Sequence, residues 1–224
     1  MSLDLLPAVE LEPELPARNA VIWLHGLGAD GHDFPPIVPE LHLAPMLAIR
    51  WVFPHAPSIP IAINGGMVMP AWYDIRSPDL GARPDERGIR LSAARVVRLI
   101  EREIERGVPS ERIVLAGFSQ GGAIAAHVAL RHAERLAGLV ALSTYLVLPE
   151  TLEAERSQVN RELLVFQAHG SFDPMVTLAR GVGSHEHLCA LGYEVEWHEY
   201  PMEHQVCLPE IRDLGVWLAR RFES

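Results

Sequence analysis

The chain has 224 residues, 49% of them hydrophobic and 21% charged, which is typical of a soluble globular domain with a substantial core. Its formal net charge of −10 argues against nucleic acid and an anionic membrane surface as main partners. Cys189 and Cys207 have no metal-ligand spacing and predict free thiols in a reducing compartment. The N-terminus predicts neither a signal peptide nor a membrane span, so we expect a cytoplasmic protein.

Apolar runs alternate with amphipathic segments from residue 19 onward. Buried strands are predicted at 19–26, 48–55, 112–118, 136–144, 162–170 and 193–200. Helices are predicted at 87–107, 120–133, 175–192 and 205–222. This alternation indicates one α/β domain over residues 1–224, with a mainly parallel central sheet and helices on both faces. Active sites in such sheets lie at the carboxyl ends of the strands.

The segment 56–75 interrupts the alternation. Asn64-Gly65-Gly66 separates two apolar runs, 61–63 and 67–69, and these residues favour a tight hairpin turn. Two interpretations are equally supported by the residues alone. The hairpin either covers one edge of the sheet or forms a wall of an apolar binding site.

A G-x-S-x-G motif lies where a predicted strand meets a predicted helix, at Gly117-Phe118-Ser119-Gln120-Gly121. In a nucleophile elbow the serine occupies a strained turn between strand and helix, and its hydroxyl projects above the sheet. Glycines on either side remove β-carbons that would collide there. The following helix N-terminus offers free N–H groups to a developing anion. The motif therefore predicts Ser119 as a nucleophile.

A serine nucleophile needs a base and a carboxylate that orients the base. The order Ser, then Asp, then His selects Asp173 and His204, each in a loop after a predicted strand. The other candidates are poorly placed and are interpreted as structural or solvated: His127, His132, His169, His185, His187, His198 and Asp213.

An oxyanion hole would complete the site. One donor is expected from the backbone N–H of Gln120, directly after the nucleophile. The glycine-rich segment 23–31, WLHGLGADG, follows a strand, and the N–H of Leu27 is the candidate second donor. The alternative is a flexible connection with glycines at turn positions.

Six segments together resemble the phospholipase/carboxylesterase family of α/β-hydrolases, which includes acyl-protein thioesterases and small bacterial carboxylesterases. They are VIWLHGLGADGHDF, AWYDI, LAGFSQGGAIA, LSTYL, AHGSFDPMV and YPMEHQV, in the family's order over nearly the whole chain. The resemblance implies an α/β-hydrolase fold, a catalytic triad of Ser119, Asp173 and His204, and oxyanion donors at Leu27 and Gln120. Members of this family are often dimers, which makes a homodimer an expectation for this chain. The triad mechanism itself needs no metal or organic cofactor.

The resemblance further implies that the segment matching 59–72 lines an acyl-binding channel, with Ile61, Met67, Met69 and Trp72 as substrate contacts. Glu203 and Met175 depart from the family pattern and bear on substrate preference. We expect a serine carboxylesterase for small to medium acyl esters. The alternatives are a long-chain acyl-protein thioesterase or lysophospholipase, and a non-catalytic ligand-binding protein, which would have a broken triad.

Overall fold

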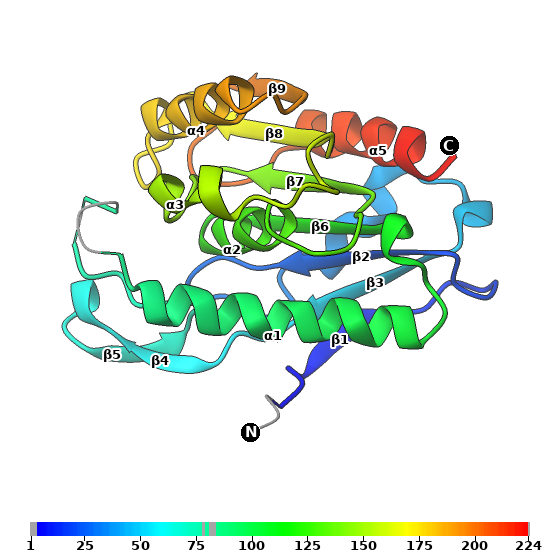
Figure 1. The fold of residues 1–224 in the computed structure, drawn as a ribbon, viewed down its shortest axis with the longest axis horizontal. Helices are drawn as coiled ribbons and strands as arrows, with labels where there is room; N and C mark the ends of the chain where they lie inside the picture. The colour runs from blue at the N-terminus through cyan, green and yellow to red at the C-terminus, as the bar shows by residue number, and fades with distance from the viewer. Residues whose placement is uncertain (1–3, 78, 81–83, 224) are drawn as a thin grey trace.

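The computed structural model describes residues 4–77, 79–80 and 84–223, and its centre is a seven-stranded sheet (Figure 1). The strand order is β1-β3-β2-β6-β7-β8-β9, and all neighbours are parallel except the antiparallel pair of β1 and β3. The strands are β1 Ala8–Leu11, β2 Asn19–Leu24, β3 Ile49–Pro54, β6 Ile113–Phe118, β7 Gly138–Leu142, β8 Val165–Gly170 and β9 Val195–Tyr200. The predicted α/β architecture is confirmed.

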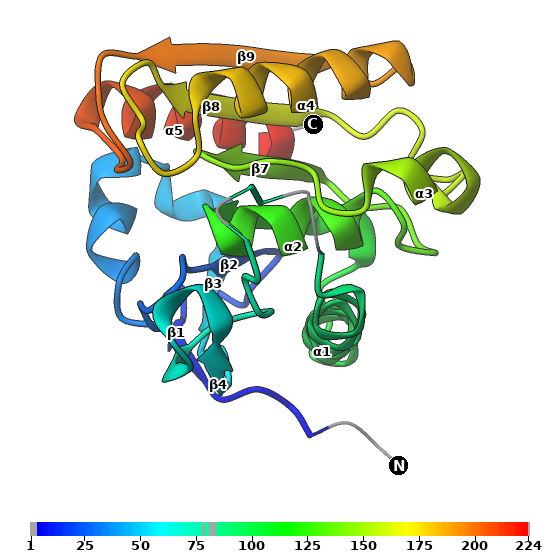
Figure 2. The same ribbon diagram turned by 90° about the vertical axis from the view of Figure 1, so that its left-hand side faces the viewer.

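Helices cover both faces because successive residues of the buried strands point in opposite directions. Ile22 and Leu24 belong to one hydrophobic cluster, whereas Val21 and Trp23 belong to the other. The first cluster includes residues of α1 Glu86–Glu105, α2 Gln120–Ala129, α3 Pro149–Glu155 and α4 Leu178–Ala190. The second includes residues of α5 Leu208–Glu223 and of the 3-10 segments Pro35–Leu41 and Pro45–Leu47. Figure 2 shows α1 and these 3-10 segments on opposite sides of the sheet.

None of the helices in the described part of the chain combines the length and apolar character that a membrane crossing requires. The helix boundaries lie within a few residues of those predicted, apart from α3, which the sequence analysis did not predict. Strand β1 was missed as well. It is a short, half-buried edge strand whose sequence, Ala-Val-Glu-Leu, carries little periodic signal.

The segment 56–75 contains a hairpin of β4 Ser58–Ile61 and β5 Met67–Pro70, which form a separate two-stranded sheet. The predicted tight turn at Asn64-Gly65-Gly66 is wrong in detail. The connection also includes a 3-10 turn, Ala62–Asn64, before Gly65 and Gly66 at φ +64° and +82°. Glycine adopts such angles at no steric cost, so these two residues reverse the chain.

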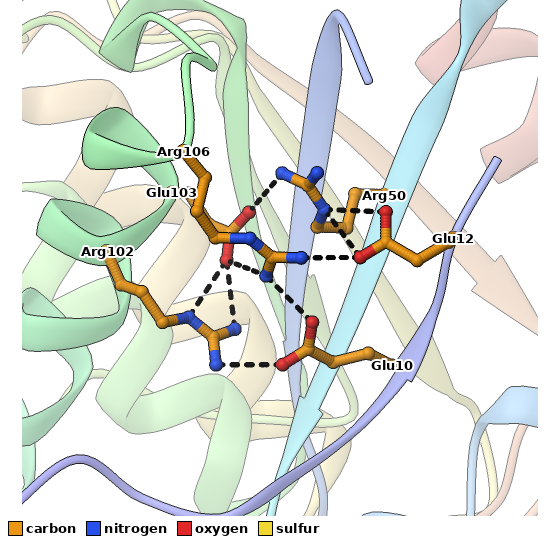
Figure 3. A network of polar contacts seen from close by, with 6 residues as sticks. All are labelled: Glu10, Glu12, Arg50, Arg102, Glu103 and Arg106. Carbon is orange, nitrogen blue, oxygen red and sulfur yellow. Dashed lines mark hydrogen bonds and ion pairs between the residues drawn. The ribbon is translucent and has the colours of Figure 1, made fainter. Parts of the chain in front are cut away.

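An ionic network centred on the buried Glu103 connects β1 and β3 to α1 (Figure 3). Glu103, fully buried on α1, accepts hydrogen bonds from Arg50 at 2.9 Å and from Arg102 at 2.9 and 3.0 Å. Arg106 also donates to Glu103, at 3.0 Å. Glu10 and Glu12, which belong to the N-terminal segment, form ion pairs with the same three arginines. Three carboxylates thus neutralise three guanidinium groups, which lets the charges lie between helix and sheet.

Candidate active site

Ser119 occupies the sharp turn between β6 and α2, at the carboxyl end of the sheet. Its backbone has φ +53° and ψ −123°, angles that a non-glycine residue adopts only under strain. The Ser119 N–H donates to the Leu142 carbonyl at 2.9 Å, and Thr144 Oγ1 donates to the Ser119 carbonyl at 2.6 Å. These bonds from β7 and from the segment after it hold the strained residue in place.

The two glycines of the motif allow the close approach that the turn requires. A Cβ on Gly121 would lie 2.3 Å from the Leu24 carbonyl oxygen and 2.4 Å from that of His25. A Cβ on Gly117 would lie 2.5 Å from the backbone of Gly121. Any side chain at either position would therefore push α2 away from β2 and β6.

Ser119, His204 and Asp173 form one chain of hydrogen bonds. The Ser119 hydroxyl lies 2.8 Å from His204 Nε2, and His204 Nδ1 lies 2.6 Å from Asp173 Oδ2. Because a carboxylate only accepts, Nδ1 carries the proton and Nε2 is free to accept the serine proton. The loops after β8 and β9 supply Asp173 and His204, since neighbouring parallel strands end at the same edge.

Asp173 is buried, and the backbone fixes its orientation. Its Oδ1 accepts the N–H groups of Met175 at 2.8 Å and Val176 at 2.9 Å, which leaves Oδ2 for His204. His169 Nε2 lies 3.6 Å from the same Oδ2 but only 2.7 Å from the Val176 carbonyl, to which it donates. Burial lowers the pKa of His169, so this ring is neutral and acts as structural support.

Leu27 lies in the loop after β2, next to His25, which sequence reasoning did not single out. The His25 ring is buried, Nδ1–H donates to the Gly26 carbonyl at 2.7 Å, and Nε2 accepts the Ala56 N–H at 3.1 Å. Desolvation lowers the pKa of His25, consistent with a neutral ring. In a trans peptide the C=O and N–H point in opposite directions. The anchored Gly26 carbonyl therefore turns the Leu27 N–H away from the His25 ring.

Two further bonds fasten this loop to the segment that follows β3. The Gly28 N–H donates to the Pro70 carbonyl at 2.8 Å, and the Gly31 N–H donates to His55 Nδ1 at 3.1 Å. Together with the bond between His25 and Ala56, they hold the loop against the segment 55–70. We call residues 25–31 the oxyanion loop.

Gln120 connects the serine turn to the hairpin segment. Its backbone N–H belongs to the first turn of α2, where N–H groups have no partner within the helix. Its side-chain Oε1 accepts the Trp72 N–H at 2.8 Å, and its Nε2 donates to the Tyr73 carbonyl at 2.7 Å. Trp72 in turn donates from Nε1 to the His25 carbonyl at 2.8 Å.

A cavity of about 220 Å³ opens beside Ser119 and His204. Its apolar wall consists of Leu27, Ile75, Leu80, Phe118, Met175 and Val176, and Tyr145 and Asp33 add polar atoms. Phe118 and Tyr145 belong to motifs that the sequence analysis quoted, although it gave neither residue a role.

The four residues expected to contact substrate are not among those that line this cavity. Ile61 and Trp72 are fully buried, because the hairpin packs its inner face against the body of the protein. Met67 is 63% exposed, and Met69 lies beside Gly28, whose Cβ position is 3.9 Å from the Met69 sulfur. In this structure Met69 and Trp72 lie against the oxyanion loop, at Gly28 and His25, and neither reaches the cavity.

The chain matches the family model for phospholipases and carboxylesterases over residues 7–220. It is 40% identical over 210 residues to acyl-protein thioesterase 1 of Neurospora crassa, covering 90% of this chain and 86% of the relative. Acyl-protein thioesterase 1 of Cryptococcus neoformans is 37% identical over 230 residues, covering 95% and 96%. Among solved structures, Arabidopsis thaliana SOBER1 has a TM-score of 0.86 at 29% identity, covering 92% of this chain and 99% of that one. Zea mays acyl-protein thioesterase 2 has a TM-score of 0.86 at 27% identity, covering 96% and 99%.

Proposed function

Since this chain belongs to the phospholipase/carboxylesterase family of α/β-hydrolases, we propose that it is a serine carboxylesterase in which Ser119, His204 and Asp173 are the catalytic triad. Family membership supports a serine hydrolase of the esterase and thioesterase type. The observation that carries the residue assignment is the unbroken chain of bonds from Ser119 Oγ through His204 to Asp173, at 2.8 and 2.6 Å. It also argues against a ligand-binding protein with a broken triad.

The reaction proceeds in two halves. His204 Nε2 takes the proton of Ser119 while Oγ attacks the ester carbonyl, and Asp173 stabilises the imidazolium that forms. The N–H groups of Leu27 and Gln120 bind the tetrahedral oxyanion. His204 then protonates the departing alcohol, leaving an acyl-enzyme. Water activated by His204 attacks the acyl-enzyme and releases the acid.

Ser119→Ala tests this assignment. We expect nearly complete loss of p-nitrophenyl ester hydrolysis and of labelling by a fluorophosphonate, with an unchanged circular dichroism spectrum. Ser58→Ala, on the exposed start of β4, is the matched control and keeps full activity. Substantial esterase activity in Ser119→Ala would show that another residue is the nucleophile.

The size of the cavity supports small to medium acyl groups. A volume of 220 Å³ is below the roughly 300–1,000 Å³ typical of pockets for drug-sized ligands. At about 30 Å³ per water-sized group, it holds on the order of seven heavy atoms. We assign acyl contact to the apolar wall, above all to Ile75, Leu80 and Met175, and support of the oxyanion loop to Met69 and Trp72.

A long-chain thioesterase or lysophospholipase is the second candidate. A neighbouring cavity of about 350 Å³ shares Leu80 and Tyr145 with the first, so a longer chain has a path for extension. Relatives named acyl-protein thioesterase favour the same substrate class. Initial rates on p-nitrophenyl esters of increasing acyl length, and on the corresponding thioesters, separate the candidates. A maximum at short chains supports the carboxylesterase, and a maximum at long chains supports the thioesterase or lysophospholipase.

We further propose a cytoplasmic homodimer, which family resemblance supports. Exposed apolar side chains on the hairpin, Ile63, Met67 and Val68, are consistent with a partner surface. Light scattering during size-exclusion chromatography measures the mass directly, and a monomer at micromolar concentration would refute the dimer.

A further inference from the structure

Asp30 in the oxyanion loop, His32 directly after this loop and His55 directly after β3 form a side-chain cluster. None of the three is among the residues that line the active-site cavity. Each offers one potential ligand atom, and these atoms lie within 4.8 Å of one another. His32 Nδ1 lies 3.0 Å from Asp30 Oδ1, and the His32 and His55 ring centroids are 5.3 Å apart. The proposed reaction uses none of the three.

Gly31 allows the fold to bring the three residues together. A Cβ at this position would lie 2.4 Å from the Phe53 carbonyl oxygen, so only glycine lets the loop approach the end of β3 this closely. Asp30 and His32, the neighbours of Gly31 in the chain, therefore lie close to His55. Their side chains are accessible, at 73% exposed for His32 and 52% for Asp30, which leaves an entry path for an ion.

We propose that Asp30, His32 and His55 bind a divalent transition metal ion, and that the bound ion slows ester hydrolysis. Two imidazoles and one carboxylate are ligands that suit zinc and its neighbours, whereas calcium and magnesium prefer oxygen ligands alone. Water would complete the coordination because the site is open to solvent.

The bound ion competes with one of the hydrogen bonds that hold the oxyanion loop, the bond from the Gly31 N–H to His55. A neutral imidazole has one nitrogen with a free lone pair, and in His55 this is Nδ1, which accepts the Gly31 N–H at 3.1 Å. An ion at Nδ1 displaces that N–H. An ion at Nε2 shifts the ring proton to Nδ1, so Nδ1 can no longer accept the Gly31 N–H. Either mode breaks the bond and loosens the loop that carries Leu27. The effect on rate rests on the proposed role of Leu27, whereas metal binding does not.

Zinc titration by calorimetry, in parallel with esterase assays, tests the proposal. Cys189 Sγ lies 3.7 Å from His185 Nε2 and could bind zinc separately, so all proteins carry Cys189→Ser. The test variant is His32→Asn, and the matched control is His42→Asn, an exposed histidine at φ 50°, an angle that asparagine tolerates. Both keep the basal esterase activity, because neither side chain lines the cavity.

We expect one zinc ion per parent chain, and in His32→Asn at least about tenfold weaker binding, since loss even of residues behind the ligands costs that much. Zinc should lower kcat of the parent and of His42→Asn, with recovery on adding a chelator, and should do so far less in His32→Asn. Equal zinc affinity in His32→Asn, or no binding at millimolar zinc, would overturn the site. Inhibition that persists in His32→Asn would point to the catalytic His204 and overturn the link to the loop. Failure of the Ser119→Ala test would refute the proposed function without affecting the calorimetry.

Discussion

Two substitutions of His25 separate the hydrogen bonds that its buried ring makes with the backbone. In His25→Asn the side-chain amide nitrogen lies near the former Nδ1 and still donates to the Gly26 carbonyl, but the acceptor for the Ala56 N–H is lost. In His25→Gln the amide oxygen lies near the former Nε2 and still accepts from Ala56, but the donor to Gly26 is lost. His25→Asn therefore keeps the Leu27 N–H in its orientation away from residue 25, and His25→Gln does not.

The two variants should have similar stability and different rates. Each leaves one buried backbone group without a partner, which costs about 1–3 kcal/mol of unfolding free energy. Loss of one oxyanion donor costs about 100- to 1000-fold in kcat. We expect His25→Gln to lower kcat about 100-fold with KM nearly unchanged, and His25→Asn to lower it less than about tenfold.

Steady-state hydrolysis of a p-nitrophenyl ester gives kcat and KM, and urea unfolding gives the stability of each variant. A difference in kcat between two equally stable variants isolates the orientation of the loop. Equal losses of kcat in both variants, or a wild-type kcat in His25→Gln, would refute the role assigned to the Gly26 anchor.

Three further predictions address stability and specificity. Glu103→Ala should lower the unfolding free energy in urea by about 3–5 kcal/mol, because it removes the buried carboxylate that Arg50, Arg102 and Arg106 share. Glu101→Ala, in an exposed pair on the same helix, should cost less than about 1 kcal/mol, and equal losses in the two variants would contradict this reasoning. Burial raises the pKa of Glu210 to about 8 from 4.5, so between these two pH values the carboxyl is protonated in the folded chain and ionised in the unfolded chain. The unfolding free energy therefore falls by up to about 5 kcal/mol as pH rises through this range. Glu210→Gln should flatten the pH dependence of Tm, and an unchanged slope would count against this role of Glu210. Ile75→Trp should fill part of the cavity and move the optimal acyl length of p-nitrophenyl esters to shorter chains, and an unmoved optimum would exclude Ile75 from the acyl site.

Features with a local physical signature could be predicted from the sequence. The apolar strands and amphipathic helices indicated the parallel sheet, and the glycines at 117 and 121 marked the turn at Ser119. The candidates Asp173 and His204 followed from chain order and from the rule that parallel strands end at one edge. Only the structure brings the three side chains within hydrogen-bonding distance.

Contacts between distant segments carry no such signature. Strand β1 is recognisable only through its pairing with β3 and through the ion pairs of its Glu10 with Arg102 and Arg106. The sequence alone could not tell that His25 supports the oxyanion loop.

By itself, the sequence determined the sheet, its helices and the position of the sharp turn at Ser119, because hydrophobic periodicity and glycine spacing act over a few neighbouring residues. Only the tertiary structure decided that Trp72 is buried behind the loop while Ile75 and Leu80 face the cavity, since one apolar pattern serves both positions. It also decided that Asp30, His32 and His55 converge. The chain path that joins them depends on the packing of Gly31 against β3, and this lies beyond the reach of local pattern.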